Sequence, residues 1–482
     1  MPLDRLPDPN LLIQDCYVDG MWHNWPDLQR QTVRNPHDDV TIAAVPMAGH
    51  AQAMVAIDAA AAALPEWRGK LPQERADIVL KWEALIREHA ATLAALVTLE
   101  QGKPVAEAKG EVLYGADFFR LAAEEATRVH GRLLERRNAT AQAMETREPI
   151  GVVGAITPWN FPSVLVSRKV APALAAGCTM VLKPAPETPL SALAIAKLGE
   201  EAGVPPGVLN VITGDAPAIG QALMDRPDVR MITFTGSTAT GRLLGAQAAA
   251  TVKRVALELG GNAPFLVFDD ADVDLAVTHA VASRFRNAGQ TCSCTNRFLV
   301  QRGVADDFIN KLSEAVITLS PGDGFENDTD LGPLINAGAV ERTAAIQGEA
   351  VAQGATVIVG GSSRDFCYEP TLLTGVTPEM RLSKEELFAP IAGIQIFETD
   401  EEGIALANAT EYGLTAFFFA SGAPRLFKIS AALEAGIVGA NTTATSSAYA
   451  PFGGIKQSGN GREGGPDILH DYLETKLTVI GL

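Results

Sequence analysis

The residues best suited to chemistry lie in a short polar turn, RNAGQTCSCTNR, that contains two of the five cysteines in the chain. Cys292 and Cys294 stand there between Arg286 and Arg297. A thiol attacks carbon only as its thiolate, so a nucleophilic cysteine needs cations or the amino end of a helix nearby. Cys292 is the candidate nucleophile, and the two arginines are candidates for that field. A metal-site fragment, a disulfide hinge and a pair of inert buried thiols are alternatives that this spacing leaves open.

A second chemically capable segment is Glu258-Leu-Gly-Gly-Asn-Ala-Pro264, in which one carboxylate ends an apolar run. An acyl-enzyme formed on a thiol needs a base to activate water, and a partly buried glutamate is suited to that task. Taken singly, such a glutamate is more often a solvated or capping residue. No metal is expected, because zinc binds about four ligands and the nearest histidine, His279, has no C-x-x-C motif beside it.

Two further motifs, Phe234-Thr-Gly-Ser-Thr-Ala-Thr-Gly241 and Thr157-Pro-Trp-Asn-Phe-Pro162, accompany these segments. Together the four motifs resemble the aldehyde dehydrogenase superfamily, in family-like order and spacing over nearly the whole chain. The resemblance implies an NAD(P)-dependent oxidoreductase that oxidises aldehydes through a thioester on Cys292. In that scheme the Asn160 side chain and the Cys292 backbone amide hold the oxyanion, and Glu258 activates the water that releases the acid.

The composition is that of a large, acidic globular protein. The 482 residues are 47% hydrophobic and 20% charged, which favours two or three soluble domains. A net charge of −18 argues against a nucleic-acid binder and against binding to an anionic membrane surface. An odd, irregularly spaced set of five cysteines and an N-terminus without an apolar signal core favour a cytoplasmic protein. No membrane span is expected, because the longest uncharged run contains Pro158 and Pro162.

Short apolar runs alternate with helical patterns from residue 150 onward. The expected strands are 151–156, 179–183, 208–213, 231–235 and 254–259, and the helices between them are 163–176, 189–202, 215–225 and 238–250. Such alternation predicts a parallel sheet covered on both faces, with ligands at the carboxyl ends of its strands. A second alternating series from about residue 263 predicts a second α/β domain. Helical periodicity also covers residues 49–128, after a strand pair near residues 16–22.

The resemblance implies an aldehyde dehydrogenase-like α/β fold, with two doubly wound parallel-sheet domains and a small β oligomerisation flap. A dinucleotide-binding domain then takes 1–127 and 148–256, and a catalytic domain takes 257–455. An oligomerisation hairpin and a C-terminal strand take 128–147 and 456–482. In the family the hairpin crosses to a neighbouring subunit, so a homodimer or homotetramer is expected. From the residues alone, a solvated loop is the plain alternative for 131–147.

Gly236-Ser-Thr-Ala-Thr-Gly241 follows an expected strand and opens an expected helix, so its amides and the helix dipole can receive a pyrophosphate. A glycine turn of this kind is commonplace by itself. The family places Gly236 and Ser237 against the dinucleotide. The resemblance adds further cofactor contacts, which are Thr157, Trp159, Lys183, Pro186, Gly220, Glu386 and Phe388.

The choice between NAD and NADP stays open. Lys183 ends an expected strand, where a lysine can reach the adenosine ribose or a 2′-phosphate. Three residues later the family carries a carboxylate that favours NAD or a hydroxyl that tolerates NADP, whereas this chain has Pro186, whose side chain can do neither. Glu386-Leu-Phe388 resembles the family's nicotinamide-ribose position, although Ala389-Pro390 follows in place of Gly-Pro.

Within the superfamily, the chain looks most like the succinate-semialdehyde dehydrogenases. Their substrate carboxylate is held by two arginines and a serine, which map onto Arg168, Arg286 and Ser446. Guanidinium groups bind carboxylates with planar paired donors, whereas each arginine alone is more often a surface ion pair. The expected substrate is a small aldehyde with a distal carboxylate, and succinate semialdehyde is the best guess.

Several alternatives accompany this prediction. The polar loop 441–451 replaces a more aliphatic stretch, and Glu463-Gly-Gly-Pro resembles 2-oxoglutarate-semialdehyde dehydrogenases. A longer dicarboxylate semialdehyde, or an aromatic aldehyde stacked near Tyr449 or Trp159, therefore stays open. Cys294 is a candidate redox partner of Cys292, with an inert thiol as the favoured alternative. A catalytically silent dinucleotide-binding or structural relative, and an acylating enzyme that uses coenzyme A, are the competing functions.

Overall fold

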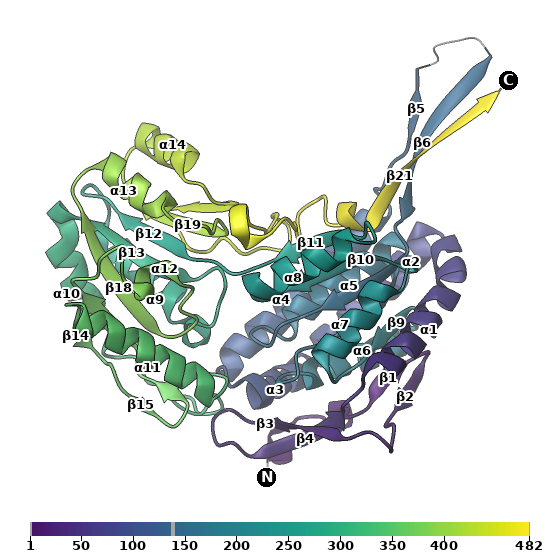
Figure 1. Ribbon diagram of the computed structural model, residues 1–482, viewed down its shortest axis with the longest axis horizontal. Helices are drawn as coiled ribbons and strands as arrows, with labels where there is room; N and C mark the ends of the chain where they lie inside the picture. The colour runs from purple at the N-terminus through teal and green to yellow at the C-terminus, as the bar shows by residue number, and fades with distance from the viewer. Residues whose placement is uncertain (1, 136–139, 482) are drawn as a thin grey trace.

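The computed structural model describes residues 2–135 and 140–481. It contains two seven-stranded sheets, each packed with helices, and a narrow three-stranded arm that projects from the body (Figure 1). The predicted fold class, two α/β sheets with a small β flap, is therefore confirmed. Within the described residues, no helix combines the length and the apolar character needed to cross a membrane.

The first sheet has the strand order β11-β10-β7-β8-β9-β1-β2. Its parallel strands are β7 (Val152–Ile156), β8 (Thr179–Lys183), β9 (Leu209–Val211), β10 (Val229–Thr235) and β11 (Arg254–Glu258). The helices between them are α5 (Val164–Ala176), α6 (Leu190–Ala202), α7 (Ala216–Asp225) and α8 (Thr238–Ala249). These elements follow the predicted alternation, with boundaries shifted by one or two residues.

One edge of the first sheet is antiparallel. β1 (Cys16–Val18) runs antiparallel to β9 and forms a hairpin with β2 (Met21–His23). Asp19 and Gly20 connect the two strands with φ of 52° and 74°, which is the left-handed backbone that a two-residue hairpin turn requires. The strand pair predicted near residues 16–22 is therefore confirmed, and it extends the first sheet at one edge.

The N-terminal helices cover the first sheet. After the ribbon of β3 (Arg30–Arg34) and β4 (Thr41–Pro46), the chain forms α1 (His50–Gly69), α2 (Pro72–Glu88), α3 (Ala90–Gln101) and α4 (Val105–Ala126). Helix α3 is buried along its length, and α4 packs against α2 and α5. Gly102, with φ of 93°, ends α3 and leaves Lys103 in the buried connection to α4.

The second sheet has the order β14-β17-β18-β13-β12-β19-β20. Its parallel strands are β12 (Ala263–Val267), β13 (Thr295–Gln301), β17 (Thr371–Thr374), β18 (Ile391–Phe397), β19 (Thr415–Phe419) and β20 (Ile437–Ala440), with β14 (Thr356–Val359) antiparallel at one edge. Its helices are α9 (Val273–Arg284), α10 (Ala305–Val316), α11 (Ala337–Ala352), α12 (Arg381–Lys384), α13 (Asp400–Asn408) and α14 (Ala423–Ala432). Beside it lies the small pair of β15 (Ser363–Arg364) and β16 (Cys367–Tyr368).

The projecting arm consists of β5 (Arg132–Leu134), β6 (Ala141–Pro149) and β21 (Leu473–Gly481) (Figure 1). The C-terminal strand β21 pairs antiparallel with β6 from Leu473 opposite Pro149 to Gly481 opposite Ala141. The pairing that the resemblance implied for these two segments is therefore confirmed. The predicted hairpin includes residues 136–139, which lie outside the described residues.

The carboxyl ends of strands in the first sheet lie close to the turn that precedes β13 in the second sheet. From β7 the chain moves to β8 and β9 on one side and later returns to β10 and β11 on the other, which makes the gap between β7 and β10 a topological switch point. The loops after these two strands carry Asn160 and Ser237, and β11 ends at Glu258. The turn before β13 carries Cys292 to the same place, where it lines a cavity with Asn160 and Ser237.

Candidate active site

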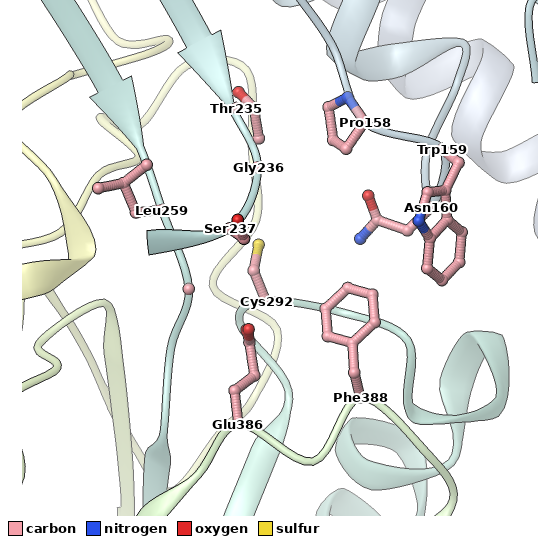
Figure 2. A pocket seen from close by; sticks show the side chains of 11 residues that line it. Pro158, Trp159, Asn160, Thr235, Gly236, Ser237, Leu259, Cys292, Glu386 and Phe388 are labelled. Carbon is pink, nitrogen blue, oxygen red and sulfur yellow. The ribbon is translucent and has the colours of Figure 1, made fainter. Parts of the chain in front are cut away.

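Cys292 lies where two cavities meet. The first, of about 220 Å³, is lined by residues from the ends of β7, β10 and β11 and from the turn after α12 (Figure 2). The second, of about 440 Å³, extends from Cys292 towards α4 and α5. Asn160 is the other residue that lines both cavities. An aldehyde carbon can therefore meet the thiol from one cavity while a second reactant approaches it from the other.

The surroundings of Cys292 act on the pKa of its thiol in opposite directions. Burial raises the pKa of Cys292 to about 12, and the carboxylate of Glu386 adds to this rise. Arg168 works in the opposite direction and favours the thiolate. The expectation that Arg297 supplies the stabilising field is wrong, because its guanidinium donates to Asn262 and to the carbonyls of residues 406 and 407.

Arg286 does not fill that role either. Its side chain is exposed and lies over the ring of Phe161, 5.5 Å from its centre, on the side of the larger cavity. Arg168, on α5, is the cation that lowers the pKa of Cys292. The sequence places Arg286 close to Cys292 in the chain, but the left-handed backbone of Asn287 and Ala288 turns the chain sharply between them.

Asn160 presents its side-chain amide to the thiol of Cys292 across the smaller cavity (Figure 2). One amide hydrogen is donated to the carbonyl of Gln290 at 3.0 Å. A primary amide has two N–H donors, so the second can serve an oxygen bound next to Cys292. This geometry suits an oxyanion donor, as the sequence predicted.

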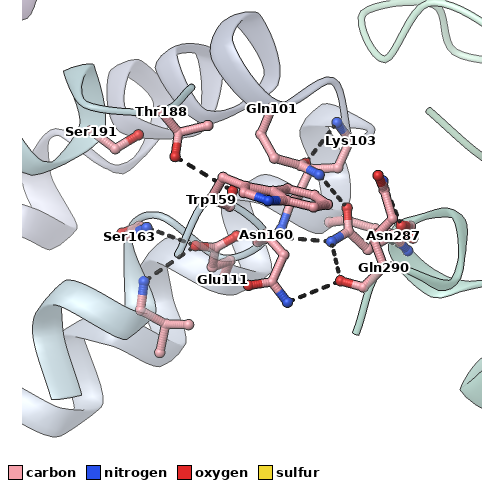
Figure 3. Close-up of polar contacts among 12 residues, drawn as sticks. Gln101, Lys103, Glu111, Trp159, Asn160, Ser163, Thr188, Ser191, Asn287 and Gln290 are labelled. Atoms are coloured by element: carbon pink, nitrogen blue, oxygen red, sulfur yellow. Dashed lines mark hydrogen bonds and ion pairs between the residues drawn. The ribbon is translucent and has the colours of Figure 1, made fainter. Parts of the chain in front are cut away.

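A buried polar network holds the Asn160 segment in place (Figure 3). Lys103 donates to the Asn160 carbonyl at 2.8 Å and to Glu111 at 2.6 Å, and its ammonium group lies 3.7 Å from the ring centre of Phe161. Asn287 donates to the same Asn160 carbonyl at 3.0 Å. The loop that carries the oxyanion donor is therefore tied both to α4 and to the turn that carries Cys292.

Glu111 completes this network at the start of α5. Its second carboxylate oxygen accepts from the backbone N–H groups of Ser163 at 2.8 Å and Val164 at 3.2 Å. These groups are unpaired donors of the first helical turn, where a negative charge is stabilised by the helix dipole. One carboxylate thus caps the helix that follows Asn160 and neutralises the buried ammonium of Lys103.

Glu258 ends β11 with its carboxyl group fully buried. Neither of its side-chain oxygens has a hydrogen-bond partner among the described residues. Burial raises the pKa of Glu258 well above its usual value, and the carboxylate of Glu463 raises it further. Cys292 and Glu258 are close enough for the charge of Glu258 to raise the pKa of the thiol. A buried carboxyl group without a protein partner, beside a thiol, is suited to exchange protons with water.

Glu386 and Phe388 face Cys292 from the turn after α12 (Figure 2). One Glu386 oxygen accepts from the N–H of Gly261 at 2.9 Å, and burial raises the pKa of Glu386 to about 7. A side chain at Gly261 would collide with the Cys292 carbonyl, and one at Gly260 would stand 2.8 Å from the Glu386 carboxylate. The Gly-Gly pair is therefore required by close packing beside the thiol.

The larger cavity collects the three residues predicted to hold a substrate carboxylate. Arg168, Arg286 and Ser446 all line it, together with Cys292. Arg168 is buried, and it donates to the Tyr114 hydroxyl at 2.8 Å and lies 3.5 Å from Glu463. The two guanidinium groups therefore differ in their surroundings. Arg168 already has protein partners, whereas Arg286 is exposed.

A family model described as the aldehyde dehydrogenase family matches residues 22–478. The chain belongs to the aldehyde dehydrogenase family. It is 49% identical to the NADP⁺-dependent succinate-semialdehyde dehydrogenase of Escherichia coli (strain K12), over 99% of this chain and 100% of the relative. It is 48% identical to the 3-sulfolactaldehyde dehydrogenase of Pseudomonas putida, over 99% of each. The crystal structure of succinate-semialdehyde dehydrogenase from Burkholderia pseudomallei matches with a TM-score of 0.97 and 48% identity, over 99% of this chain and 100% of that chain.

Proteins of this family use NAD(P)⁺, and this aldehyde dehydrogenase is accordingly an NAD(P)-dependent oxidoreductase. The smaller cavity fits part of the cofactor, because α8 begins at its wall with amides that can receive a phosphate, and the buried hydroxyl of Thr235 there has no partner among the described residues. Predicted cofactor contacts that line this cavity are Trp159, Gly236, Ser237, Glu386 and Phe388. The remaining predicted contacts, Thr157, Lys183, Pro186 and Gly220, do not line it.

Lys183 is nevertheless placed to bind an anion. It ends β8, and its ammonium group makes no hydrogen bond or ion pair within the described chain. Burial lowers the pKa of Lys183 to about 8. An unpaired, largely buried lysine at the carboxyl end of a parallel strand fits the adenosine side of a dinucleotide, where it would contact the ribose or its phosphate.

Cys294 turns away from Cys292 in this aldehyde dehydrogenase. Its sulfur accepts from Arg284 at 3.3 Å and donates to the Gly289 carbonyl at 3.4 Å. All five cysteines are free thiols. Tyr449, named for an aromatic substrate, is exposed and lines neither cavity. Within the described residues, no group of three or more His, Cys, Asp or Glu side chains could hold a metal ion.

Sequence reasoning missed the charged residues that support the site. Lys169 is completely buried on α5 and donates to Glu463 at 2.7 Å and to Thr233 at 3.1 Å. One signal was available, since Arg168 and Lys169 interrupt a helix that is otherwise apolar around its circumference. Cations in such a helix must be paired, because an isolated buried charge is costly. Glu463 and Lys103 lie in loops and carry no comparable signal.

Proposed function

We propose that this enzyme oxidises a small semialdehyde with a distal carboxylate, with succinate semialdehyde to succinate as the reaction that fits best. The observation that carries this proposal is the shared cavity of Cys292, Arg168, Arg286 and Ser446. The names of the succinate-semialdehyde dehydrogenases among the relatives support the same substrate class. Arg286 is the principal carboxylate ligand in this proposal, because its charge is unpaired, and Arg168 and Ser446 assist it.

The proposed chemistry uses residues of both cavities. The Cys292 thiolate attacks the aldehyde carbon, and the resulting oxyanion accepts hydrogen bonds from the Asn160 amide and the Cys292 backbone amide. A bound nicotinamide would accept the hydride. Loss of this hydride from the substrate carbon leaves a thioester on Cys292. Glu258 then takes a proton from water, which attacks the thioester, releases the carboxylic acid and restores the thiol.

The division of labour follows the two sheets. We propose that the unit built on the first sheet, residues 1–127 and 148–256, binds the dinucleotide through Lys183, Gly236 and Ser237. The unit built on the second sheet, residues 257–455, supplies Cys292 and Arg286. Glu258 stands at the connection between them, as the final residue of β11. NAD and NADP both remain candidate cofactors in this proposal.

We further propose a cytoplasmic homodimer or homotetramer assembled through the β5–β6–β21 arm. The arm exposes apolar side chains, among them Leu133 at 75%, Leu477 at 61% and Val479 at 59%. A row of exposed apolar residues of this kind is typical of an interface between subunits. The molar mass measured by light scattering tests this, with Val479→Asp expected to shift the enzyme towards smaller species.

The substrate proposal is tested with two aldehydes of four carbons, succinate semialdehyde and butyraldehyde, which differ in the carboxylate. Arg286→Ala should lower kcat/KM for succinate semialdehyde about 10- to 100-fold, the effect of losing hydrogen bonds to a charged group, and leave butyraldehyde unchanged. Arg302→Ala is the matched control, because this arginine is exposed and paired with Glu398 far from Cys292. Equal losses for both aldehydes in Arg286→Ala would refute the carboxylate site.

A further inference from the structure

A third cavity, the chamber, has a volume of about 210 Å³ and lies next to the 440 Å³ cavity that is the proposed substrate cavity. Arg286, Ser293 and Ser446 line both spaces, so the chamber and the substrate cavity are neighbours that share these three residues. The remaining polar walls of the chamber come from α9 and from the loop after β20, and they are Ser283, Thr443 and Thr445. Hydroxyl groups therefore surround a space that a four-carbon substrate bound between Cys292 and Arg286 would leave empty.

The hydroxyls of this chamber fall into two groups. Two are held by the protein, because Ser283 bonds to Thr295 at 2.9 Å and Thr443 bonds to His279 at 3.0 Å. In the described part of the chain, the side-chain hydroxyls of Ser293, Thr445 and Ser446 make no hydrogen bond to another protein group. Each of the three can both donate and accept, which suits hydroxyl groups of a ligand.

The charges around the two spaces direct an anionic group to Arg286. The lining of the substrate cavity also includes Glu107, whose carboxylate repels an anion, and Glu111, which is paired with Lys103. Arg168 is partly neutralised by Glu463 at 3.5 Å. Arg286 has no ion pair or hydrogen bond among the described residues; it lies over the ring of Phe161, and its charge lowers the pKa of the nearby Glu107. The unpaired cation thus stands at the boundary between the substrate cavity and the hydroxyl-lined chamber.

We propose that the chamber is a second substrate subsite, which binds the hydroxylated distal part of an aldehyde acid with more than four carbons. Arg286 binds the carboxylate of such a substrate from the chamber side, and Ser293, Thr445 and Ser446 exchange hydrogen bonds with its hydroxyl groups. Thr445 is the specificity-determining residue, because it lines the chamber and not the cavity next to Cys292. This inference rests on the proposed oxidation of carboxylated aldehydes and extends its substrate class to polyhydroxylated aldehyde acids.

The loop that builds the chamber is rich in hydroxyl side chains. Residues 442–447 include Thr442, Thr443, Thr445, Ser446 and Ser447. Aliphatic side chains at Thr443 and Thr445 would present no donor or acceptor to a ligand. A site built from hydroxyls instead rejects an analogue that lacks hydroxyl groups, because its own polar groups then lose solvent without gaining a partner.

The test compares galactarate with adipate, two six-carbon dicarboxylates that differ in their hydroxyl groups. Calorimetric titration of the full-length enzyme should show galactarate binding at least about tenfold more tightly than adipate. Thr445→Val should remove most of this preference and Thr445→Ser should restore it. The matched control Thr442→Val, on the same loop but outside the chamber, should keep it.

Equal binding of galactarate and adipate to the unmodified enzyme would overturn the subsite, as would an undiminished preference in Thr445→Val. Turnover of succinate semialdehyde is measured on the same samples. Preserved turnover without a preference for galactarate refutes the subsite alone. A lack of turnover with every carboxylated aldehyde refutes the proposed function, whatever the dicarboxylates show.

Discussion

Replacing Lys103 by methionine should both destabilise the protein and slow hydride release. The ammonium group of Lys103 is completely buried and is paired with Glu111 at 2.6 Å, with side-chain exposures of 0% and 1%. Removing one partner of a buried ion pair leaves an uncompensated charge and costs about 3–5 kcal/mol. The same change removes one of the two side-chain donors to the Asn160 carbonyl, so the oxyanion donor loses part of its support.

The double variant Lys103→Met/Glu111→Gln separates these effects. It removes the unpaired buried charge, while the glutamine oxygen can still accept from the amides of Ser163 and Val164. Its stability should therefore recover towards that of the unmodified enzyme, because replacing both members of a buried pair is far less costly than breaking it. The rate of hydride release should stay low, because Asn160 still lacks the lysine donor.

Urea denaturation followed by tryptophan fluorescence measures the stability, and stopped-flow absorbance of NAD(P)H measures hydride release. Lys311→Met is the matched control, because this lysine forms surface ion pairs with Asp274 and Asp307, and its urea midpoint should be unchanged. A single Lys103→Met variant as stable and as fast as the parent would contradict the role assigned to this network. Full recovery of the hydride rate in the double variant would show that Lys103 does not position Asn160.

Two other predictions concern Asn160 and Lys183. Asn160→Ala should slow hydride release about 10²- to 10³-fold with little change in the dissociation constant of the cofactor, and an unchanged single-turnover rate would exclude an oxyanion role. Lys183 is charged below its pKa of about 8, so any preference for NADP⁺ over NAD⁺ should fall as the pH rises through 8. Fluorescence titrations of both cofactors from pH 6.5 to 9.5 should show this trend in the parent and none in Lys183→Met. Identical pH profiles in the two proteins would show that Lys183 does not contact the cofactor.

The fold was predictable because its signals are local. Strands such as β8 are short, apolar at their centre and followed by helices with clear periodicity, so both the element types and the parallel pairing follow from the pattern. The turn of Gly236 and Ser237 was predictable for the same reason, because it directly joins a strand to a helix. The antiparallel β1 at the sheet edge depends instead on pairing with β9, some 190 residues later, and composition does not encode that contact.

The candidate site was predictable as a set of reactive groups but not as an electrostatic environment. Cys292, Asn160 and Glu258 come from motifs; Cys292 and Asn160 line the same cavities, and Glu258 is near enough for its charge to raise the pKa of the thiol. The raised pKa of Cys292 depends on burial and on Glu386, which lies 94 positions later in the chain. The prediction that Arg297 stabilises the thiolate was wrong. Arg297 is close to Cys292 in sequence, but its side chain donates to Asn262 and to the carbonyls of residues 406 and 407. Arg168, which favours the thiolate, lies on a helix that the motif of Cys292 does not include.

The division of labour between Cys292 and Glu258 is tested most directly by a single stopped-flow experiment on Glu258→Gln with saturating succinate semialdehyde and NAD(P)⁺. The expected result is one equivalent of NAD(P)H per active site, followed by a stall, with an intact mass increased by one acyl group on Cys292. Glutamine keeps the shape of the side chain but cannot take the proton from water. Continued turnover at the parent rate, or a burst in Cys292→Ala, would contradict the thioester route.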